Sequence, residues 1–326
     1  MGPSENILVI KLGAMGDFIQ ALGPMAAIAK HHPCANITLL TTAPYVELAK
    51  ASGLFNDVWI DSRPKLFDVK KILQFRSRIL EKNFHRIYDL QTSDRSGFYF
   101  HLLSPWLKLF LGPFAGTWQR PEWSGAVKGA SHPHTDPARA LLHTVERQKE
   151  QLSIAGINDV PASDLSWALS DVSAFGIGEP YALLVPGGSA HRPDKRWAIE
   201  NYAEIAKRMM RAGITPVIIG SEAERGICTA IERDVPGSMN LCAKTNLLDI
   251  ATLGRGAALA LGNDTGPMHI IATAGAPSVV VFSSASDPRL CQPRGKRVKV
   301  LKRDALSMLS VGEVWTILTL MRETPR

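Results

Sequence analysis

The chain has 326 residues, of which 45% are hydrophobic and 21% charged. At roughly 100–200 residues per domain this length predicts two domains, and the apolar content excludes an intrinsically disordered chain. The 37 lysines and arginines exceed the 30 acidic residues by seven. Such a balance suits an anionic ligand or surface, so nucleotide, nucleic acid, acidic sugar and lipid headgroup all stay open.

Four scattered cysteines form no C-x-x-C pair, which speaks against a zinc site or a thioredoxin-like motif. So few cysteines in a long chain fit a reducing compartment. The chain enters a strand-like run almost at once, without the pattern of a secretory leader. No apolar run reaches the roughly 18–20 residues of a membrane span. We therefore expect a cytoplasmic protein, and contact with a membrane surface stays open.

In the first half, short β-branched runs alternate with helical patterns, which predicts right-handed βαβ units and a parallel sheet. Residues 96–134 are rich in aromatic residues, Gly and Pro and are predicted to be an irregular, functional loop. The expected strands are Ile7–Leu12, Asn36–Leu40, Asp57–Ile60 and Arg86–Leu90. The expected helices are Asp17–Ala29, Leu66–Lys82 and Leu141–Ala155.

After the loop-rich stretch 157–180 the same rhythm starts again, so the linker is expected near 170–180. The expected strands are Tyr181–Val185, Thr215–Ile219, Ala257–Leu261, Ser278–Phe282 and Val298–Leu301. The expected helices are Ala198–Ala212, Glu222–Arg233, one from the cap Asn246 to Arg255, Thr265–Ala274 and Val311–Arg322. Two doubly wound α/β domains, 1–172 and 173–326, are the simplest architecture, with ligands in the cleft between them. The last helix either stays with the second domain or packs back on the first.

The first polar motif is the turn after the first strand, Lys11-Leu12-Gly13-Ala14-Met15-Gly16-Asp17. Its glycine spacing is neither that of a dinucleotide-binding turn nor that of a P-loop. An acid at the beginning of a helix has an ordinary explanation as a cap or dipole partner. Because Asp17 follows the carboxyl end of a strand, a carboxylate that faces the cleft is the alternative.

The second motif, residues 262–269, reads Gly-Asn-Asp-Thr-Gly-Pro-Met-His and again joins a strand to a helix. Free backbone N–H groups and the positive helix end make such a turn an anion site. Asp264 and Thr265 either cap the helix or contact a ligand. His269, one turn further on, is either a satisfied core histidine or part of the site.

The third motif is the glycine loop Gly187-Gly188-Ser189 after the strand at 181–185, followed by Lys195-Arg196. Loop amides and Ser189 can contact phosphate oxygens, and Lys195 or Arg196 can neutralise charge. The two cations are otherwise an ordinary solvated pair. Glu222 follows the next strand and is placed either to accept from ribose hydroxyls or to lie in a first helical turn.

In their order and separation these motifs, with Phe282-Ser283 and Asp287-Pro288, resemble glycosyltransferase family 9, the ADP-heptose:lipopolysaccharide heptosyltransferases. The resemblance covers most of the chain and implies an α/β GT-B fold. It implies an inverting transfer with an ADP-sugar donor and a lipopolysaccharide-type acceptor, without metal or cofactor. It makes Asp17 the catalytic base. The donor-binding residues that it implies are Lys11, Gly16, Ser189, Lys195, Glu222, Asp264, Thr265, Gly266, Met268 and His269.

One departure concerns the segment after Asp17, where many family members carry a His or Thr and this chain has Phe18-Ile19-Gln20-Ala21. Gln20 is therefore an open question about the acceptor pocket. The physics of the reaction agrees with the other assignments, because a helix N-terminus and a lysine suit a leaving nucleoside diphosphate. A single carboxylate on the acceptor side suits general base catalysis.

A basic segment in the first domain suggests where an anionic acceptor binds. Residues 63–86 include eight Lys/Arg and only two acids. These basic residues either form an ordinary solvated face or attract an acidic saccharide-lipid at the inner membrane. Arg63, Arg95 and Arg120 are the expected acceptor contacts. The aromatic stretch 98–114 either packs as a core hairpin or dips into the membrane interface.

Two other functions compete with sugar transfer. An NAD(P)-dependent oxidoreductase would also have two α/β domains, but its G-x-G-x-x-G turn is missing after the first strand. A non-enzymatic protein that binds nucleic acid or anionic lipid would use the basic run 289–303. The strand inside that run favours an exposed sheet edge or donor-side loop, so we expect no nucleic-acid partner.

Overall fold

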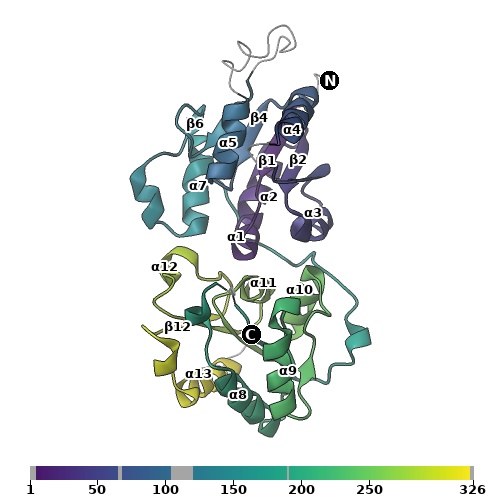
Figure 1. Cartoon of the computed structure of the whole chain (residues 1–326), viewed down its shortest axis with the longest axis vertical. Coiled ribbons are helices and arrows are strands. Elements are labelled where there is room, and N and C mark those ends of the chain that lie inside the picture. Colours follow the sequence, from purple (N-terminus) through teal and green to yellow (C-terminus); the bar gives the residue numbers. More distant parts are fainter. Residues whose placement is uncertain (1–4, 65–67, 104–119, 189–190, 324–326) are drawn as a thin grey trace. The chain divides into compact units, whose positions relative to one another are not determined.

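The computed structural model describes residues 5–64, 68–103, 120–188 and 191–323. The chain forms two compact units, of which unit 1 comprises Met1–Gly13 and Ala21–Ser163. Unit 2 comprises Ala14–Gln20 and Asp164–Arg326. Each unit has a six-stranded sheet flanked by helices (Figure 1).

The sheet of unit 1 is parallel throughout and has the strand order β3-β2-β1-β4-β5-β6. Its strands are β1 (Asn6–Ile10), β2 (Asn36–Thr41), β3 (Asp57–Ile60), β4 (Arg86–Asp89), β5 (Glu122–Gly125) and β6 (His132–Pro133). Its helices are α2 (Leu22–His31), α3 (Val46–Ala51), α4 (Val69–Lys82), α5 (Asp94–Leu102) and α7 (Thr144–Ile154). Short 3-10 helices are η1 (Ala43–Tyr45) and η3 (Pro137–Leu141).

The sheet of unit 2 is also parallel throughout, in the order β12-β11-β10-β7-β8-β9. Its strands are β7 (Tyr181–Val185), β8 (Thr215–Ile218), β9 (Met239–Asn240), β10 (Leu259–Asn263), β11 (Ser278–Phe282) and β12 (Val298–Lys302). Its helices are α1 (Met15–Gln20), α8 (Ile199–Arg211), α9 (Arg225–Asp234), α10 (Leu247–Gly256), α11 (Gly266–Ala274), α12 (Pro288–Cys291) and α13 (Val311–Glu323). The 3-10 helices are η4 (Ser173–Phe175), η5 (Pro193–Lys195), η6 (Glu222–Glu224) and η7 (Leu306–Met308).

Both sheets have the doubly wound strand order. Reversed, the order of unit 2 is β9-β8-β7-β10-β11-β12, which is equivalent to that of unit 1. In unit 1 the chain reverses direction between β1 and β4, and in unit 2 between β7 and β10. Ligands of such sheets bind beyond the carboxyl ends of the strands at this switch point. The predicted α/β fold class is confirmed, and the switch points locate where a site belongs.

Apolar strands account for the core of each unit. Every residue of β7, β10 and β11 is buried, as expected for central parallel strands that are covered on both faces. In unit 2, α8 packs against α13, whose Val314 and Leu318 lie in the core. The last helix therefore belongs to the core of unit 2.

The single helix predicted for Asp17–Ala29 is wrong, because α1 ends at Gln20 and α2 begins at Leu22. Pro24 explains the break. It has no N–H to donate to the carbonyl four residues earlier, and a proline is tolerated only in the first turn of a helix. The two short helices belong to different units.

The loop predicted for 96–134 is also wrong in part. The structure has α5 and the strands β5 and β6 there, while residues 104–119, with most of the aromatic stretch, lie outside the described residues. Ser93 caps α5 by accepting from the Ser96 N–H, and the Ser96 hydroxyl accepts from the Ser93 N–H. Local capping and burial of Tyr99 in the core stabilise this helix despite its glycine.

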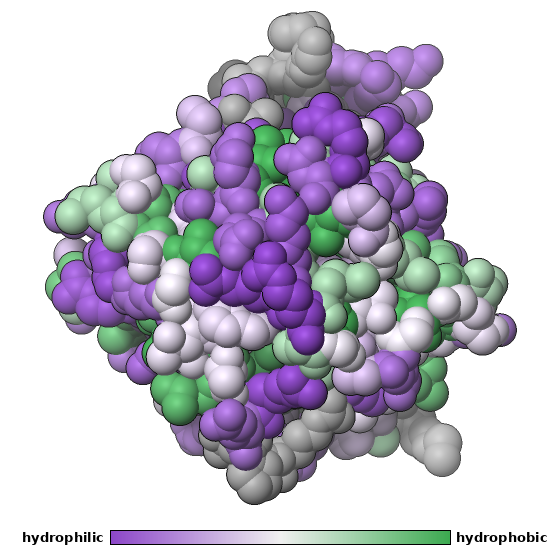
Figure 2. Space-filling view, turned by 90° about the horizontal axis from the view of Figure 1, so that it is seen from below, coloured by the Kyte–Doolittle hydropathy of each residue, from purple (hydrophilic) through white to green (hydrophobic). Residues whose placement is uncertain are grey.

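On the face shown in Figure 2, hydrophilic and hydrophobic residues are interspersed. In the part of the chain that the structure describes, none of the helices combines the length and apolar character of a membrane span.

Candidate active site

A cavity of about 300 Å³ lies at the carboxyl ends of β7 and β10, where the sheet of unit 2 reverses direction. The glycine loop after β7, the end of β8 and the turn into α11 line it. This is the position at which doubly wound sheets bind ligands. Residues from the second and third motifs therefore meet at one place.

The N-terminus of α11 presents hydrogen-bond donors to this cavity. Thr265 occupies the N-cap position, but its side chain makes no capping bond. Among the described residues, no partner satisfies the buried Thr265 Oγ1. Gly266 and Pro267 begin the helix and also line the cavity. An unused hydroxyl beside a positive helix end is a suitable place for an anion.

Lys195 and Asp264 form an ion pair beside the cavity. The Lys195 ammonium lies 2.7 Å from Asp264 Oδ2, and the two side chains are only 14% and 10% exposed. Ser286, in the loop after β11, donates from its hydroxyl to the same oxygen at 2.7 Å. Asp264 therefore accepts from both Lys195 and Ser286, and the carboxylate that Ser286 holds in turn fixes the position of the Lys195 ammonium. Ser286 was not predicted as a site residue, although it follows the strand β11 at the same sheet edge.

In the glycine loop, both the backbone N–H and the backbone carbonyl of Gly188 are hydrogen-bonded. The Gly188 N–H donates to Glu224 Oε1 at 3.2 Å, and the Gly188 carbonyl accepts from Arg196. A methyl group at residue 187 would lie 2.5 Å from Glu224 Oε1, so any larger residue there would displace the Glu224 side chain. Ser189, the next predicted residue, lies outside the described residues.

Two acids near the end of β8 differ in position. Glu222 is exposed, and the Arg225 guanidinium lowers its pKa by hydrogen bonding. Glu224 lines the cavity, and its second oxygen accepts from the Ser221 N–H at 2.7 Å. The structure thus places Glu224, and not the predicted Glu222, at the cavity.

The short helix α1 packs against α11. A methyl group at residue 266 would lie 2.5 Å from Met15 Cβ, and one at residue 16 would lie 2.7 Å from the His269 ring. Both glycines therefore allow the helices to approach closely. Asp17, in the first turn of α1, is half-buried and makes no hydrogen bond or ion pair with other described residues.

His269 is a buried residue of α11 that pairs with Gln20. Gln20 Nε2 lies 3.3 Å from His269 Nδ1, and it also donates to the carbonyls of Cys291 and Gln292. Because carbonyl oxygens only accept, this atom is the amide nitrogen, and a neutral His269 carries its proton on Nε2. Gln20 therefore positions α1 and the histidine ring.

Met268 is fully buried and packs on β10, where a methyl group at Gly262 would lie 2.6 Å from its sulfur. Its side chain belongs to the core. Any donor contact from this residue would be through its backbone N–H in the first turn of α11.

The carboxyl edge of unit 1 holds the predicted residue Lys11 and, near it, a buried acid that was not predicted, Asp89. Lys11 is buried, and its ammonium donates to the Leu90 carbonyl at 3.0 Å. Asp89 is completely buried and accepts from the N–H groups of Gln91 and Thr92. Burial raises the pKa of Asp89 to about 6.

The three arginines predicted for the acceptor lie at opposite edges of this sheet. Arg63 donates to the Leu12 carbonyl, and Arg95 donates to the Pro64 carbonyl at 2.9 Å. Both lie at the carboxyl edge. Arg120 precedes β5 at the amino edge and stacks 3.6 Å over the Phe100 ring.

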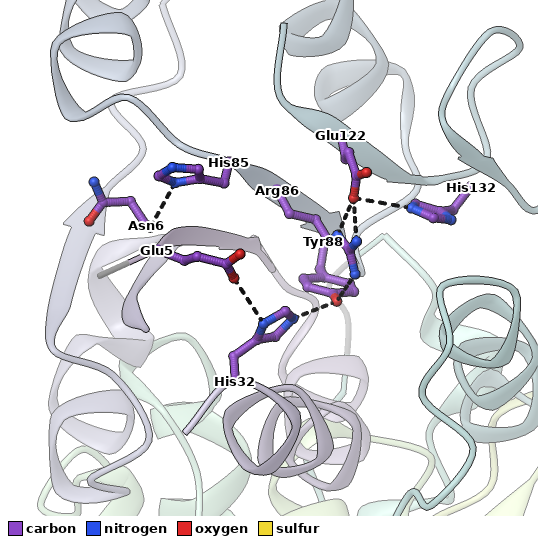
Figure 3. Close-up of polar contacts among 8 residues, drawn as sticks. All are labelled: Glu5, Asn6, His32, His85, Arg86, Tyr88, Glu122 and His132. Atoms are coloured by element: carbon purple, nitrogen blue, oxygen red, sulfur yellow. Dashed lines mark hydrogen bonds and ion pairs between the residues drawn. The ribbon is translucent and has the colours of Figure 1, made fainter. Parts of the chain in front are cut away.

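A larger cavity, of about 480 Å³, lies at the amino ends of β1, β4 and β5. Figure 3 shows the polar contacts among side chains there. His32 donates to or accepts from the Tyr88 hydroxyl at 2.8 Å and faces Glu5, and Arg86 pairs with Glu122. Burial, together with nearby positive groups, lowers the pKa of His32. These acids and bases satisfy one another at the edge opposite to the ligand-binding one, so the cavity of unit 2 is the better candidate.

No group of three or more His, Cys, Asp or Glu residues is arranged to hold a metal ion within the described ranges.

The family model for glycosyltransferase family 9 (heptosyltransferase) matches residues 72–312. Over 292 residues the chain is 23% identical to the lipopolysaccharide core heptosyltransferase OpsX of Haemophilus influenzae, covering 86% of this chain and 79% of that protein. The structure of E. coli ADP-heptose lipopolysaccharide heptosyltransferase II matches with a TM-score of 0.78 and 20% identity, over 97% and 98% of the two chains. The E. coli heptosyltransferase WaaC with ADP matches with a TM-score of 0.74 and 18% identity, over 97% and 99%.

These matches confirm the resemblance and the GT-B fold class. They support neither the oxidoreductase nor the nucleic-acid-binding alternative.

Proposed function

The chain belongs to glycosyltransferase family 9, and on this premise we propose that it transfers a heptose from ADP-heptose to a lipopolysaccharide core acceptor. The observation that carries the proposal is the cavity of unit 2, where a helix N-terminus and the glycine-loop backbone meet and where the lining residue Asp264 holds the Lys195 ammonium. The named relatives and the structure solved with ADP support the same donor.

For the donor, the diphosphate lies at the N-terminus of α11. The unused Thr265 hydroxyl and the Gly266 N–H bind its oxygens, and Lys195 supplies the positive charge. Asp264 and Ser286 hold Lys195 in position. Glu224 takes the ribose hydroxyls in place of Glu222, because its carboxylate lines the cavity. Ser189 extends this cradle.

For the reaction, Asp17 is the base. The acceptor oxygen attacks the anomeric carbon, the bond from that carbon to the ADP oxygen breaks, and the hydroxyl proton passes to the Asp17 carboxylate. Such a single displacement inverts the anomeric configuration. Negative charge grows on the departing ADP, and the α11 N-terminus with Lys195 stabilises it most in the transition state. General base catalysis of this kind contributes about 10²–10⁴-fold.

For the acceptor, the first domain (1–172) binds the saccharide and the second (173–326) binds the donor. Arg63 and Arg95 are supported as acceptor contacts by their place at the carboxyl edge of unit 1. Arg120 lies at the other edge and lacks that support.

We also propose that the enzyme works at the cytoplasmic face of the inner membrane. Helix α4 supports this by its exposed Val69 and Leu73 beside Lys70, Lys71 and Arg78. A basic face with exposed apolar side chains attracts anionic lipid headgroups, at about 1 kcal/mol per basic residue near the surface.

Product analysis with a panel of nucleotide sugars and truncated lipopolysaccharide acceptors tests the function. We expect heptose transfer from ADP-heptose, with inverted configuration in the product. An Asp17→Asn sample serves as the inactive control. Transfer of a different sugar in preference to heptose, or no transfer to any of these acceptors, would contradict the proposal.

A further inference from the structure

Asn263 ends β10 and is completely buried. Its Nδ2 donates to the carbonyl oxygens of Pro186 at 2.8 Å and Gly187 at 2.9 Å. Its Oδ1 accepts from the Trp197 backbone N–H and from the Tyr202 hydroxyl, both at 3.0 Å. The carbonyls only accept and the backbone N–H only donates, so these partners fix the orientation of the amide. All four hydrogen-bonding positions of the side chain are filled.

The partners of Asn263 come from segments that are far apart in the chain. Two carbonyls belong to the glycine loop after β7, one N–H belongs to the turn after η5, and the hydroxyl belongs to α8. The same loop is fixed further on by Glu224 and Arg196, which bind the two backbone groups of Gly188. Asn263 therefore anchors the beginning of the loop, and Glu224 anchors its end.

The amide also fixes the ion pair at the cavity. Lys195 is two residues before Trp197, and Asp264 directly follows Asn263. The bond from the Trp197 N–H to Asn263 Oδ1 thus joins the two backbone segments that carry the 2.7 Å pair. Without the Asn263 side chain, the buried Trp197 N–H and the two loop carbonyls would all lose a partner, and each would keep its full desolvation cost.

We propose that Asn263 is a positioning residue for the donor diphosphate: it sets the distance between the glycine loop, Lys195 and the N-terminus of α11. It acts through these groups and is itself buried beneath them. The inference rests on the proposed function, because it concerns how the ADP donor is held.

Titration of the full chain with ADP tests this role. Asn263→Asp keeps the shape but places a carboxylate oxygen against two carbonyls that only accept. At pH 8 we expect ADP to bind about tenfold more weakly than to the wild type, which corresponds to about 1.4 kcal/mol. At pH 6 the introduced carboxyl group, which burial keeps protonated, donates to one carbonyl, so the loss relative to wild type shrinks to about threefold. A purely structural role would change the Tm of Asn263→Asp between these pH values and leave its ADP affinity equal to that of the wild type.

Two further variants complete the test. Tyr202→Phe removes one donor to Asn263 Oδ1 and leaves the other three bonds, so ADP affinity should fall about two- to threefold. Gln151→Glu is the matched control, because Gln151 is a buried amide in unit 1 that donates to the carbonyls of Asp89 and Ser124. It should lower the Tm while ADP affinity stays within about twofold of wild type.

The outcomes separate the inference from the function. If the wild type binds ADP and Asn263→Asp binds it equally well at pH 8, the inference is overturned but the proposed function is not. An equal loss in Gln151→Glu, or a loss without pH dependence, also overturns it. Should Asn263→Asp fail to fold, unchanged affinity in Tyr202→Phe overturns it instead. A wild-type chain that does not bind ADP overturns both the inference and the proposed function.

Discussion

The two units share one strand order but differ in what lies at the carboxyl ends of their strands. In unit 2 the ends carry glycines, an unused hydroxyl and a lysine held by one carboxylate. In unit 1 they carry buried acids whose oxygens accept from neutral groups: Asp61 from the Tyr99 hydroxyl and Asp89 from backbone N–H groups. Its arginines there bind backbone carbonyls.

This difference shows that the topology locates a site and that the residues decide its ligand. An edge with free donors and positive charge suits a diphosphate. An edge with buried acids and surface arginines suits an acceptor that brings its own hydroxyl and anionic groups. Variants of residues in the two units test whether unit 2 binds the donor and unit 1 binds the acceptor.

The largest effect is expected for Asp17, the proposed base, which belongs to unit 2 with α1. Asp17→Asn should lower kcat about 10³-fold, because the hydroxyl proton loses its acceptor, while ADP affinity stays within about twofold. Steady-state kinetics and ADP titration measure the two quantities. Asp159→Asn, which removes an exposed acid paired with Lys30, is the matched control. Near-normal turnover of Asp17→Asn would rule out its role as the base.

A smaller loss is expected at the donor edge. Lys195→Ala should lower kcat/KM for the donor about 10–100-fold, since charge-assisted hydrogen bonds contribute about 1.5–3 kcal/mol. Lys299→Ala removes an exposed lysine of the edge strand β12 and should change nothing. Donor kinetics that are the same in both variants would contradict a phosphate role for Lys195.

The two neighbouring acids allow a sharper comparison within the donor edge. Glu224→Ala should weaken ADP binding about 5–30-fold, because it removes the proposed ribose contact and the anchor of Gly188. Glu222→Ala should leave the affinity unchanged, since that side chain pairs with Arg225 on the surface. The reverse order of effects, measured by calorimetry, would restore Glu222 as the ribose carboxylate.

The smallest effect is on stability and concerns unit 1. Folding raises the pKa of Asp89 from 3.8 to about 6, so the folded state holds this proton more tightly than the unfolded state. The stability that protonated Asp89 contributes is therefore fully present below about pH 4 and is lost as the pH rises through about 6. The shift corresponds to at most about 3 kcal/mol.

Asp89→Asn keeps an oxygen for the two backbone N–H groups and does not titrate. The variant should have a higher Tm than the wild type at pH 8, and the difference should shrink at pH 4.5. A difference that is constant between these pH values would show that Asp89 does not titrate as described.

Much of the fold could be predicted from periodicity. Tyr181–Val185 and Ser278–Phe282 are observed with the predicted bounds, because continuous, largely apolar runs between turn residues are typical of buried parallel strands. The cap Asn246 is confirmed as well. Helix α5 was missed because its stability depends on capping at Ser93 and on burial of Tyr99, which composition does not reveal.

The site was predictable where motif and sheet edge coincide, as for Thr265 and Lys195. It was not predictable where distant segments meet: Gln20 and His269 are 249 residues apart. For Glu224 a signal existed, because Ser221-Glu222-Ala223-Glu224 has the Ser-x-x-Glu spacing of a capping box. That box turns Glu224 back toward Ser221 and the cavity and leaves Glu222 in solvent.

Amide hydrogen exchange of the full chain with and without ADP tests most directly whether the donor is bound by unit 2. ADP should slow exchange in the glycine loop at 187–188 and in the first turn of α11, at 265–268. No comparable slowing is expected around Asp89 and β5 in unit 1. Protection confined to the carboxyl edge of unit 1, with residues 265–268 unchanged, would contradict donor binding by unit 2.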